Sequence, residues 1–402
     1  MEVWLTIVIC FCILYPIVPK KHIGWLLFAF VLAFAVMAFH CVPKETDDLY
    51  RYFQHLEMFR KTDWEGLQWH IKNRTDAIWD GLPVCAYYFY FVSKLGHNGF
   101  LPAITIFLCY SSMMLVIYKA SVKFEVGKWY MFWGCLFAIS TFWFYDVCSG
   151  TRNGLAFCIF ILCTYYDLAE KKYRPLCYIG YFLCAGLHSS TIVIIMVRLV
   201  IFILDKYESR LIYWTTIFSV GIGGSVLQWI GEHSSNPYLQ KLSTKAESHI
   251  ERMGYTYSSQ GDVQFFVNIV VVIVVIALSI YLFRYLKGSE KFKGFESFSK
   301  FYKLLIFFTV ASVLTGLIFV RLARWVIPIL GGMMYAIGMQ CFKNHILEEE
   351  GKVKRKSVIR QRANILNTNV LIINLLFIAF TVIHIWYACN GTSLLWLLFE
   401  PV

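Results

Sequence analysis

The sequence predicts an all-α polytopic membrane protein that forms one integral membrane domain over residues 1–402. Apolar residues make up 58% of the chain and charged residues only 15%, whereas soluble domains average about 45–50% and about 25%. The apolar residues occur in blocks long enough to cross the hydrocarbon core, which takes roughly 20 residues of helix. The ten-residue alternation of a membrane barrel is absent, and helices satisfy their own backbone in lipid.

Twelve or thirteen spans are expected along the chain. The first is a retained N-terminal span with Met1 outside, because its positive charges follow the apolar run, in reverse of a secretory signal. The other expected spans follow in order, separated by polar or basic segments. The spans are placed near 3–18, 23–41, 100–118, 129–148, 153–169, 175–187, 190–204, 211–230, 263–283, 301–320, 325–342 and 369–388.

The distribution of cations predicts the orientation. When the segments between spans are assigned alternately to two sides, one side holds 23 of the 37 Lys and Arg residues and the other holds 13. The basic side, with loops at Arg284–Lys303 and Lys343–Arg362, is cytoplasmic by the positive-inside rule. Residues 352–362 are expected to anchor the chain beside anionic lipid. This asymmetry accounts for the net charge of +12 without nucleic acid as a partner.

Three connecting segments have their own expected structures. Segment 82–95 would break the charge rule if it crossed the membrane, so we expect a short re-entrant or interfacial helix. The outer loop Val42–Gly81 places Trp64, Leu67 and Ile71 on one helical face, which is typical of a helix lying in the headgroup layer. The second outer loop, Gly231–Asp262, is polar and is either a cover for a site or a solvated connector.

The thirteen cysteines are scattered and mostly lie inside the expected spans. No CxxC pair or Cys/His ligand spacing occurs, so the sequence indicates neither a metal site nor a disulfide framework. Walker and HExxH motifs are also absent, and we expect no metal or cofactor. The absence of these motifs favours a lipid-linked substrate that binds on the outer side of the membrane.

Arg152 follows an expected outer turn in the stretch "SGTRNG", where Ser149 and Thr151 are candidate N-caps. A cation at a helix N-terminus is opposed by the helix dipole, so Arg152 does not stabilise that helix end. The same place suits a bound anion, because free N–H groups and a guanidinium meet there. The alternative is an arginine that contacts headgroup phosphates.

Arg321 and Arg324 stand three residues apart in "GLIFVRLARW" and share a helical face. They also fall on the outer side, where the charge rule predicts few cations. Together with Arg152 they are interpreted as a clamp for phosphate or pyrophosphate. The alternative is a set of unrelated headgroup contacts.

Two further segments offer candidate acid–base groups. His188, in "AGLHSSTIV", lies at an outer turn and is either a helix-end cap or a general base or hydrogen bonder to substrate. In "PKETDDLYRYF", Asp47 and Asp48 are adjacent, so they do not share a helical face as a paired acid and base. One of them is a candidate acceptor of a sugar hydroxyl proton, and the alternative is a solvated helix start.

With these motifs assembled, the chain resembles the EpsG family of Wzy-type polysaccharide polymerases. The resemblance rests on Thr46, Asp47 and Tyr50 in the first outer loop, on Arg-Asn-Gly-Leu-Ala from Arg152, on His-Ser-Ser-Thr from His188, and on the Arg321–Arg324 pair. Order, side of the membrane and span count fit over nearly the whole chain. The long basic inner loop and the cysteine richness do not match the family.

The resemblance implies a metal-independent glycosyltransferase with a GT-C-like fold in the bacterial cytoplasmic membrane, its active site facing outward. Such enzymes transfer a growing glycan from undecaprenyl pyrophosphate to the non-reducing-end sugar of an incoming lipid-linked repeat unit, alongside a flippase and a chain-length regulator. Arg152, Arg321 and Arg324 would bind the pyrophosphate, and His188 or Asp47 would serve the acceptor hydroxyl. Asp48, Tyr50 and Tyr52 would contact sugars.

Three other functions share parts of this pattern. A flippase for lipid-linked saccharide would use the same cations, although transporters commonly bind near mid-membrane between internal repeats, and no repeat is visible here. A membrane acyltransferase would need a donor entry from the cytoplasm and a deep histidine. A glycan ligase would share the donor clamp and is not separated from a polymerase by the sequence.

Overall fold

The computed structural model describes residues 2–73, 82–207, 209, 211–215, 229, 233–234, 261–315, 317–353 and 357–390, and over these it is an assembly of helices without a strand. Buried apolar side chains from nearly all of the helices form one continuous core. The helices are α1 (Glu2–Ile17), α2 (Ile23–Phe39), α3 (Asp48–Lys61), α4 (Trp64–Asn73), α5 (Pro83–Ser93), α6 (Phe100–Lys123), α7 (Lys128–Thr141), α8 (Phe144–Ser149), α9 (Thr151–Thr164), α10 (Arg174–Leu187), α11 (Thr191–Lys206), α15 (Gly261–Lys287), α16 (Glu296–Ala311), α17 (Leu317–Trp325), α18 (Ile327–Val353) and α19 (Ser357–Asn390), with shorter turns η1 (Lys20–His22), η2 (Tyr165–Glu170), η3 (Glu290–Phe295) and η4 (Ser312–Thr315).

Within the described chain, four helices are long and apolar enough to cross a membrane: Lys20–Phe39, Phe100–Lys123, Phe266–Lys287 and Thr368–Ile385. A fifth span is possible if Phe319–Trp325 and Ile327–Glu348, bent by 48°, act as one. The chain is therefore an all-α polytopic membrane protein. Most of the other expected spans are helices of 14 to 16 residues. Most of the expected span 211–230 lies outside the described residues.

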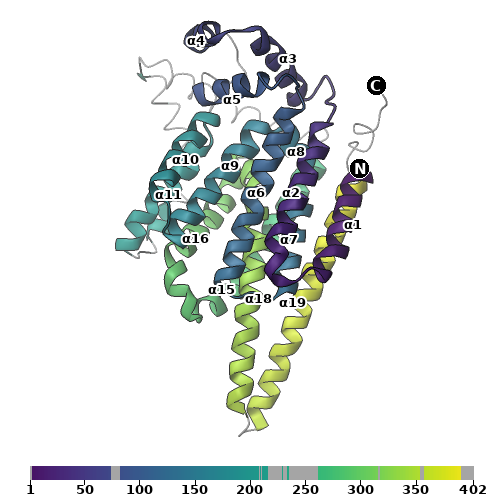
Figure 1. Cartoon of the computed structure of the whole chain (residues 1–402). Coiled ribbons are helices and arrows are strands. Elements are labelled where there is room, and N and C mark those ends of the chain that lie inside the picture. Colours follow the sequence, from purple (N-terminus) through teal and green to yellow (C-terminus); the bar gives the residue numbers. More distant parts are fainter. Residues whose placement is uncertain are drawn as a thin grey trace.

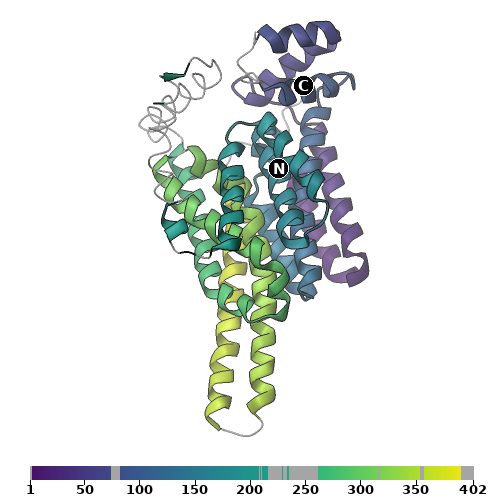
Figure 2. The same ribbon diagram turned by 90° about the vertical axis from the view of Figure 1, so that its left-hand side faces the viewer.

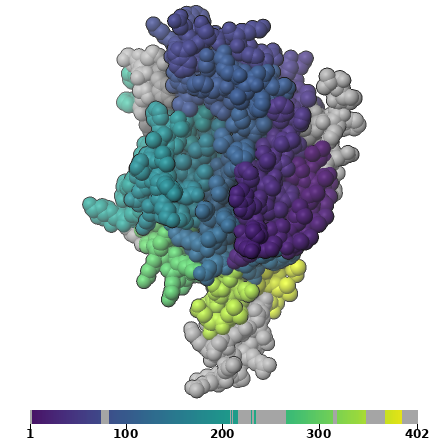
Figure 3. All heavy atoms as spheres, in the orientation of Figure 1, coloured from purple at the N-terminus to yellow at the C-terminus, as the bar shows by residue number. Residues whose placement is uncertain are grey.

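The bundle has two different ends (Figure 1). At one end, called the capped end, α3, α4 and α5 lie over the helix termini, and they cover this end in the space-filling view (Figure 3). At the other end, called the hairpin end, α18 and α19 project side by side beyond the remaining helices (Figures 1 and 2). The helix α9 runs between the ends, starting at the capped end, so its first and last residues belong to opposite sides of the bundle.

Segment 82–95 forms the 11-residue helix α5, which begins with Pro83 at its first turn. At about 1.5 Å per residue, this length is too short to cross the hydrocarbon core. The helix lies across the capped end (Figure 1), which agrees with the expectation of a short non-spanning helix. In α4, Leu67 is buried whereas Trp64 is exposed and stacks on Tyr87 of α5 at 5.8 Å between ring centroids.

The segments expected as connections on the basic side contain helix over much of their length. The segment 284–303 contains the end of α15, the turn η3 and the start of α16. In the segment 343–362, α18 continues to Val353 and α19 begins at Ser357, with 354–356 outside the described residues. The described residues of the basic stretch 352–362 thus belong to the end of α18 and the start of α19. Most of the outer loop 231–262 lies outside the described residues.

The helices α7 and α18 approach each other through glycine. A Cβ built on Gly332 would lie 2.3 Å from the carbonyl oxygen of Gly134, and one on Gly134 would lie 2.5 Å from that of Gly332. Small residues allow such close backbone approach between membrane helices. This contact holds α18, and with it the end of α17, against the centre of the bundle.

Lys94 ties α3 to α5 at the capped end. Its amine donates to the carbonyl oxygens of Phe59 at 2.9 Å, Arg60 at 3.2 Å and Thr62 at 2.6 Å. These carbonyls belong to the last turn of α3 and its C-cap residue, where intrahelical donors run out, although that of Phe59 also accepts the N–H of Thr62 at 3.2 Å. The positive charge of Lys94 also interacts favourably with the partial negative charge at the C-terminus of α3.

Replacing Lys94 with Met is expected to destabilise the C-terminal turn of α3 by about 1–2 kcal/mol, because three carbonyl acceptors lose a charged donor. Hydrogen–deuterium exchange over residues 55–62 should become faster, with little change in α9. Lys61→Met is the matched control, since Lys61 is an exposed cation in the same helical turn. Equal exchange in both variants would contradict a capping role for Lys94.

Candidate functional site

Arg152 lies in the first turn of α9 at the capped end and is half-buried. The N-cap residue of this helix is Gly150, without a side-chain cap, so the prediction that Ser149 or Thr151 caps it is wrong. Thr151 instead donates to the carbonyl oxygen of Cys148 at 3.0 Å. The guanidinium therefore stands at a helix N-terminus whose N–H groups are not covered by a neighbouring hydroxyl.

Tyr52, from the first expected outer loop, meets Arg152 directly. The Nε of Arg152 donates to the hydroxyl of Tyr52 at 3.3 Å, and its guanidinium lies 5.8 Å from the centre of the Tyr52 ring. Burial raises the pKa of Tyr52 above its ordinary value, and the charge of Arg152 offsets only part of this rise. The phenol is therefore neutral at physiological pH and keeps its own proton available for a third group.

Asp47 and Asp48 have different surroundings. Asp47 is the N-cap residue of α3, and its Oδ2 accepts the backbone N–H of Lys44 at 2.8 Å and the hydroxyl of Tyr145. Asp48 forms an exposed ion pair with Arg51 at 3.3 Å. Only Asp47 is thus joined to the inner part of the capped end.

The two late arginines both lie on α17 but reach different elements. The Nη1 of Arg324 lies 3.3 Å from Oδ2 of Asp146 in α8, with both side chains partly exposed. The Nη1 of Arg321 donates to the hydroxyl of Ser190 in the turn between α10 and α11. The next residue, Trp325, is buried. Its ring would lie 3.1 Å from a Cβ built on Gly150 and 3.6 Å from one built on Gly154. The end of α17 is consequently packed against the start of α9.

His188 is buried at the C-cap of α10. Its Nδ1 accepts the backbone N–H of Ser190 at 3.2 Å, and its carbonyl oxygen accepts the hydroxyl of Thr191 at 2.7 Å. The His-Ser-Ser-Thr motif is thus a compact turn held by its own polar groups. Ser190 connects this turn to Arg321, so His188 and Arg321 belong to the same part of the capped end.

The four motifs selected from the sequence are therefore joined at one end of the bundle. The first loop contacts α8 through Asp47 and Tyr145 and contacts α9 through Tyr52 and Arg152. The start of α9 packs on α17 through Trp325, and α17 reaches the His188 turn through Arg321. Asp47 and His188 are linked to these contacts through different helices. The loop of Asp47 contacts α8 and α9, whereas the turn of His188 contacts α17.

Sequence reasoning missed the residues that make these connections: Tyr145, Asp146, Ser190 and Trp325. The adjacent pair on α8 is the most informative, because Tyr145 binds the Asp47 carboxylate and Asp146 pairs with Arg324. Asp146 could have been selected from the sequence. An acidic residue in the apolar stretch "STFWFYDVC" needs a partner, and cations close to the membrane are the natural ones.

The electrostatic character of this end is positive. Arg152, Arg321 and Arg324 bring three guanidinium groups, which Asp146 and Asp47 balance only in part, and the N-terminus of α9 adds the positive end of its dipole. Among the described residues, no group of three or more His, Cys, Asp or Glu side chains has the arrangement of a metal site. The arrangement suits an anion with several oxygens, held by guanidinium and backbone N–H groups.

Comparisons with protein-family models, with curated proteins and with solved structures found no match for this chain.

Replacing Tyr145 with Phe is expected to release the Asp47 carboxylate, since a hydrogen bond to a charged group contributes about 1.5–3 kcal/mol. Amide exchange at residues 44–50 should accelerate about tenfold or more, because the first turn of α3 loses its tie to α8. Tyr50→Phe, on the same loop, is the matched control. Unchanged exchange at these residues in the Tyr145 variant would show that the contact does not hold the loop.

Proposed function

We propose that the chain is a metal-independent glycosyltransferase that polymerises lipid-linked oligosaccharide repeat units, as its resemblance to the EpsG family of Wzy-type polymerases implies. One observation supports this proposal most directly. Four short motifs that are far apart in the sequence, and that define the resemblance, contact one another at the capped end. Chance matches to unrelated turns would not be expected to meet in this way.

In the proposed reaction, the growing glycan leaves undecaprenyl pyrophosphate and is joined to the non-reducing-end sugar of the incoming repeat unit. Negative charge develops on the departing pyrophosphate in the transition state. Fixed guanidinium groups stabilise such charge without a metal ion. Arg152 and the pair on α17 are assigned this role, because they lie on two helices that pack together at the capped end through Trp325.

The acceptor hydroxyl requires a base or an oriented hydrogen-bond acceptor. His188 and Asp47 are the two candidates, one beside Arg321 and the other in the loop that carries Tyr52. Tyr50 and Tyr52 are assigned to contacts with sugar. Asp48 is not retained in this role, because its carboxylate is paired with Arg51 at the surface.

The proposal places the capped end on the outer side of the bacterial cytoplasmic membrane, as the excess of cations on the opposite side favours. The shorter helices would complete the twelve or thirteen spans of a GT-C-like fold, tilted or packed in the interior of the bundle. The partners would be the lipid-linked donor and acceptor, a flippase that delivers them and a chain-length regulator.

The test is incubation of the purified full-length protein with its pyrophosphate-linked repeat unit, followed by a gel of the lipid-linked glycan. We expect a ladder that disappears in Arg152→Ala while the protein keeps its elution volume and helicity. Arg51→Ala, which removes an exposed arginine of the same end, should keep the ladder. A single unextended band with the unchanged protein, under conditions where the substrate is intact, would exclude polymerase activity.

The flippase alternative has a separate readout in the same preparation. Protein in vesicles would move the lipid-linked saccharide between leaflets without extending it, which a fluorescence-quenching assay detects. A glycan ligase would instead transfer one glycan to a different lipid acceptor and yield a single new band. Each result would replace the proposed polymerase with another use of the same cations.

A further inference from the structure

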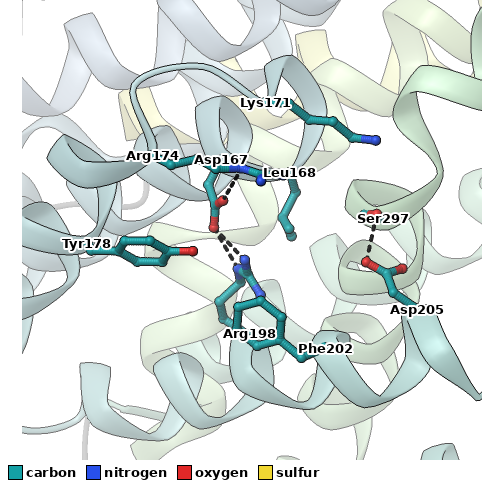
Figure 4. A pocket seen from close by; sticks show the side chains of 9 residues that line it. All are labelled: Asp167, Leu168, Lys171, Arg174, Tyr178, Arg198, Phe202, Asp205 and Ser297. Carbon is teal, nitrogen blue, oxygen red and sulfur yellow. Dashed lines mark hydrogen bonds and ion pairs between the residues drawn. The ribbon is translucent and has the colours of Figure 1, made fainter.

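The hairpin end contains a second charged site that the proposed function does not use. Its pocket lies between η2, the start of α10, the end of α11 and the start of α16, and measures about 70 Å³. The helix α9 separates it from Arg152, since η2 directly follows the last residue of α9. Figure 4 shows the lining side chains, which are Asp167, Leu168, Lys171, Arg174, Tyr178, Arg198, Phe202, Asp205 and Ser297.

The two carboxylates of this pocket are already compensated. The Oδ2 of Asp167 accepts Nη2 and Nε of Arg198 at 2.6 and 2.9 Å and the hydroxyl of Tyr181 at 3.1 Å, with both members of the ion pair almost fully buried. Asp205 accepts the hydroxyl of Ser297 at 2.8 Å and lies 3.3 Å from the amine of Lys300, which also pairs with Glu296 at 3.3 Å. The Oδ1 of Asp167 is buried and accepts no hydrogen bond from a described residue, and the Nε of Arg174 lies 3.6 Å from it. The ion pairs with Arg198 and Lys300 reduce the repulsion that the two carboxylates exert on an incoming anion.

Beyond these ion pairs, the pocket carries the positive charges of Lys171 and Arg174. Arg174 is exposed and contacts Asp167 only at 3.6 Å, and Lys171 is exposed with no ion pair to any described residue. Arg198 lines the pocket, and its Nη1 is buried without a hydrogen-bond acceptor in the described part of the chain. Figure 4 shows Lys171 and Arg174 along one side of the pocket and Arg198 on the opposite side.

The backbone adds to this positive character. Arg174 begins α10 and is followed by Pro175, which has no N–H, while the N–H of Cys177 donates to the carbonyl oxygen of Tyr173 at 3.0 Å. The N–H groups of Arg174 and Leu176 are therefore the donors without an intrahelical acceptor at this helix start. A cation in the first turn is unfavourable beside the positive end of the helix dipole unless an anion lies there too. The residues leading into this helix, Lys171 and Tyr173, both have positive φ, at 55° and 54°, so the chain turns sharply between the end of η2 and the start of α10.

We propose that this pocket binds a phosphate group, held by Lys171, Arg174 and the N-terminus of α10, with the buried Arg198 as a fixed charge beneath it. The ligand class is a phosphate ester, either the headgroup of an anionic lipid or a free phosphate. The exposed apolar side chains of α10 and α11 that flank the pocket, Leu176, Phe202 and Ile203, give the lipid source a surface for its acyl chains. The site is independent of the reaction assigned to the capped end.

The test uses the purified full-length protein in neutral detergent with phosphatidylglycerol as the probe and phosphatidylcholine as the uncharged reference. Native mass spectrometry counts the bound lipid. The variant Lys171→Gln/Arg174→Gln changes two exposed side chains, and Lys172→Gln is the matched control, since Lys172 is an exposed neighbour outside the pocket lining. We expect the double variant to lose about tenfold in affinity for phosphatidylglycerol, through loss of two charge-assisted contacts, and the control to stay within about twofold.

A competition arm separates the two sources of phosphate. If millimolar inorganic phosphate displaces the lipid from the wild-type protein, the ligand is a free phosphate. The same conclusion holds if phosphate, in the presence of phosphatidylcholine, raises the melting temperature of the wild-type protein but not that of the double variant. If only phosphatidylglycerol binds, the ligand is a headgroup. Equal lipid affinity in the wild type and the double variant, with no effect of phosphate, would overturn the proposal, as would an equal loss in Lys172→Gln. Should the double variant not fold, Lys171→Gln alone carries the comparison.

Discussion

Replacing Arg321 or Arg324 with Gln is expected to slow glycan polymerisation by about 100- to 1,000-fold, the effect of removing one fixed donor to developing transition-state charge. The two residues lie on one helix, α17, but contact different elements through Ser190 and Asp146. We therefore expect both substitutions to lower kcat rather than only to raise KM. The rate of ladder growth at saturating repeat unit measures this.

The controls separate charge from packing. Lysine at either position keeps the cation but loses the planar fork of donors, so partial recovery is expected in Arg321→Lys and Arg324→Lys. Asp146→Asn removes the partner of Arg324 while leaving the guanidinium in place. If both Gln variants keep a normal ladder, the α17 arginines do not act on the pyrophosphate, and headgroup contacts become the better explanation.

The second large effect concerns stability. Gly332→Ala places a Cβ 2.3 Å from the carbonyl oxygen of Gly134, an approach that only a shift of one helix backbone relieves. Overpacking typically destabilises by about 1–3 kcal/mol, and a clash with backbone belongs at the upper end of this range. The loss should appear as a lower melting temperature in detergent, together with lower activity, because α18 positions the end of α17.

Gly24→Ala on α2 is the matched control for this substitution. Its added Cβ would meet the hydroxyl end of Tyr118 at 3.4 Å, an ordinary contact with a side chain. We expect it to leave the melting temperature within about 2 °C of the wild type, as for a change of less than about 0.5 kcal/mol. A Gly332→Ala protein as stable as this control would mean that α7 and α18 can separate without loss.

The amino-acid sequence was enough to predict the helical membrane class, because long apolar segments with few charges are stable as helices in the hydrocarbon core of a bilayer. It also predicted that segment 82–95 would be a short helix, since a full crossing there would place the basic segment 119–128 on the outer side. The basic segments 284–303 and 343–362 were predicted only as connections on the cytoplasmic side. Their helices were not predicted, because charge indicates contact with water but not the conformation of the chain.

The candidate site likewise contains residues that the sequence predicted and residues that only the structure revealed. Arg152, Arg321, Arg324, His188 and Asp47 were selected because polar groups at the edge of a bilayer require a reason. Tyr145 and Trp325 were not selected, because aromatic residues are common throughout this chain and nothing local distinguishes a ring that joins two helices.

By itself, the sequence determined which apolar segments are helical and which charged groups need partners, because these properties depend on local hydrophobicity and on the energy of a charge in lipid. The tertiary structure alone decided which partners they have. It paired Arg324 with Asp146, linked Arg321 to the His188 turn and placed the Asp167–Arg198 pair beneath a second basic pocket. These contacts join residues from separate helices, and their geometry follows from helix packing, which no short stretch of sequence encodes.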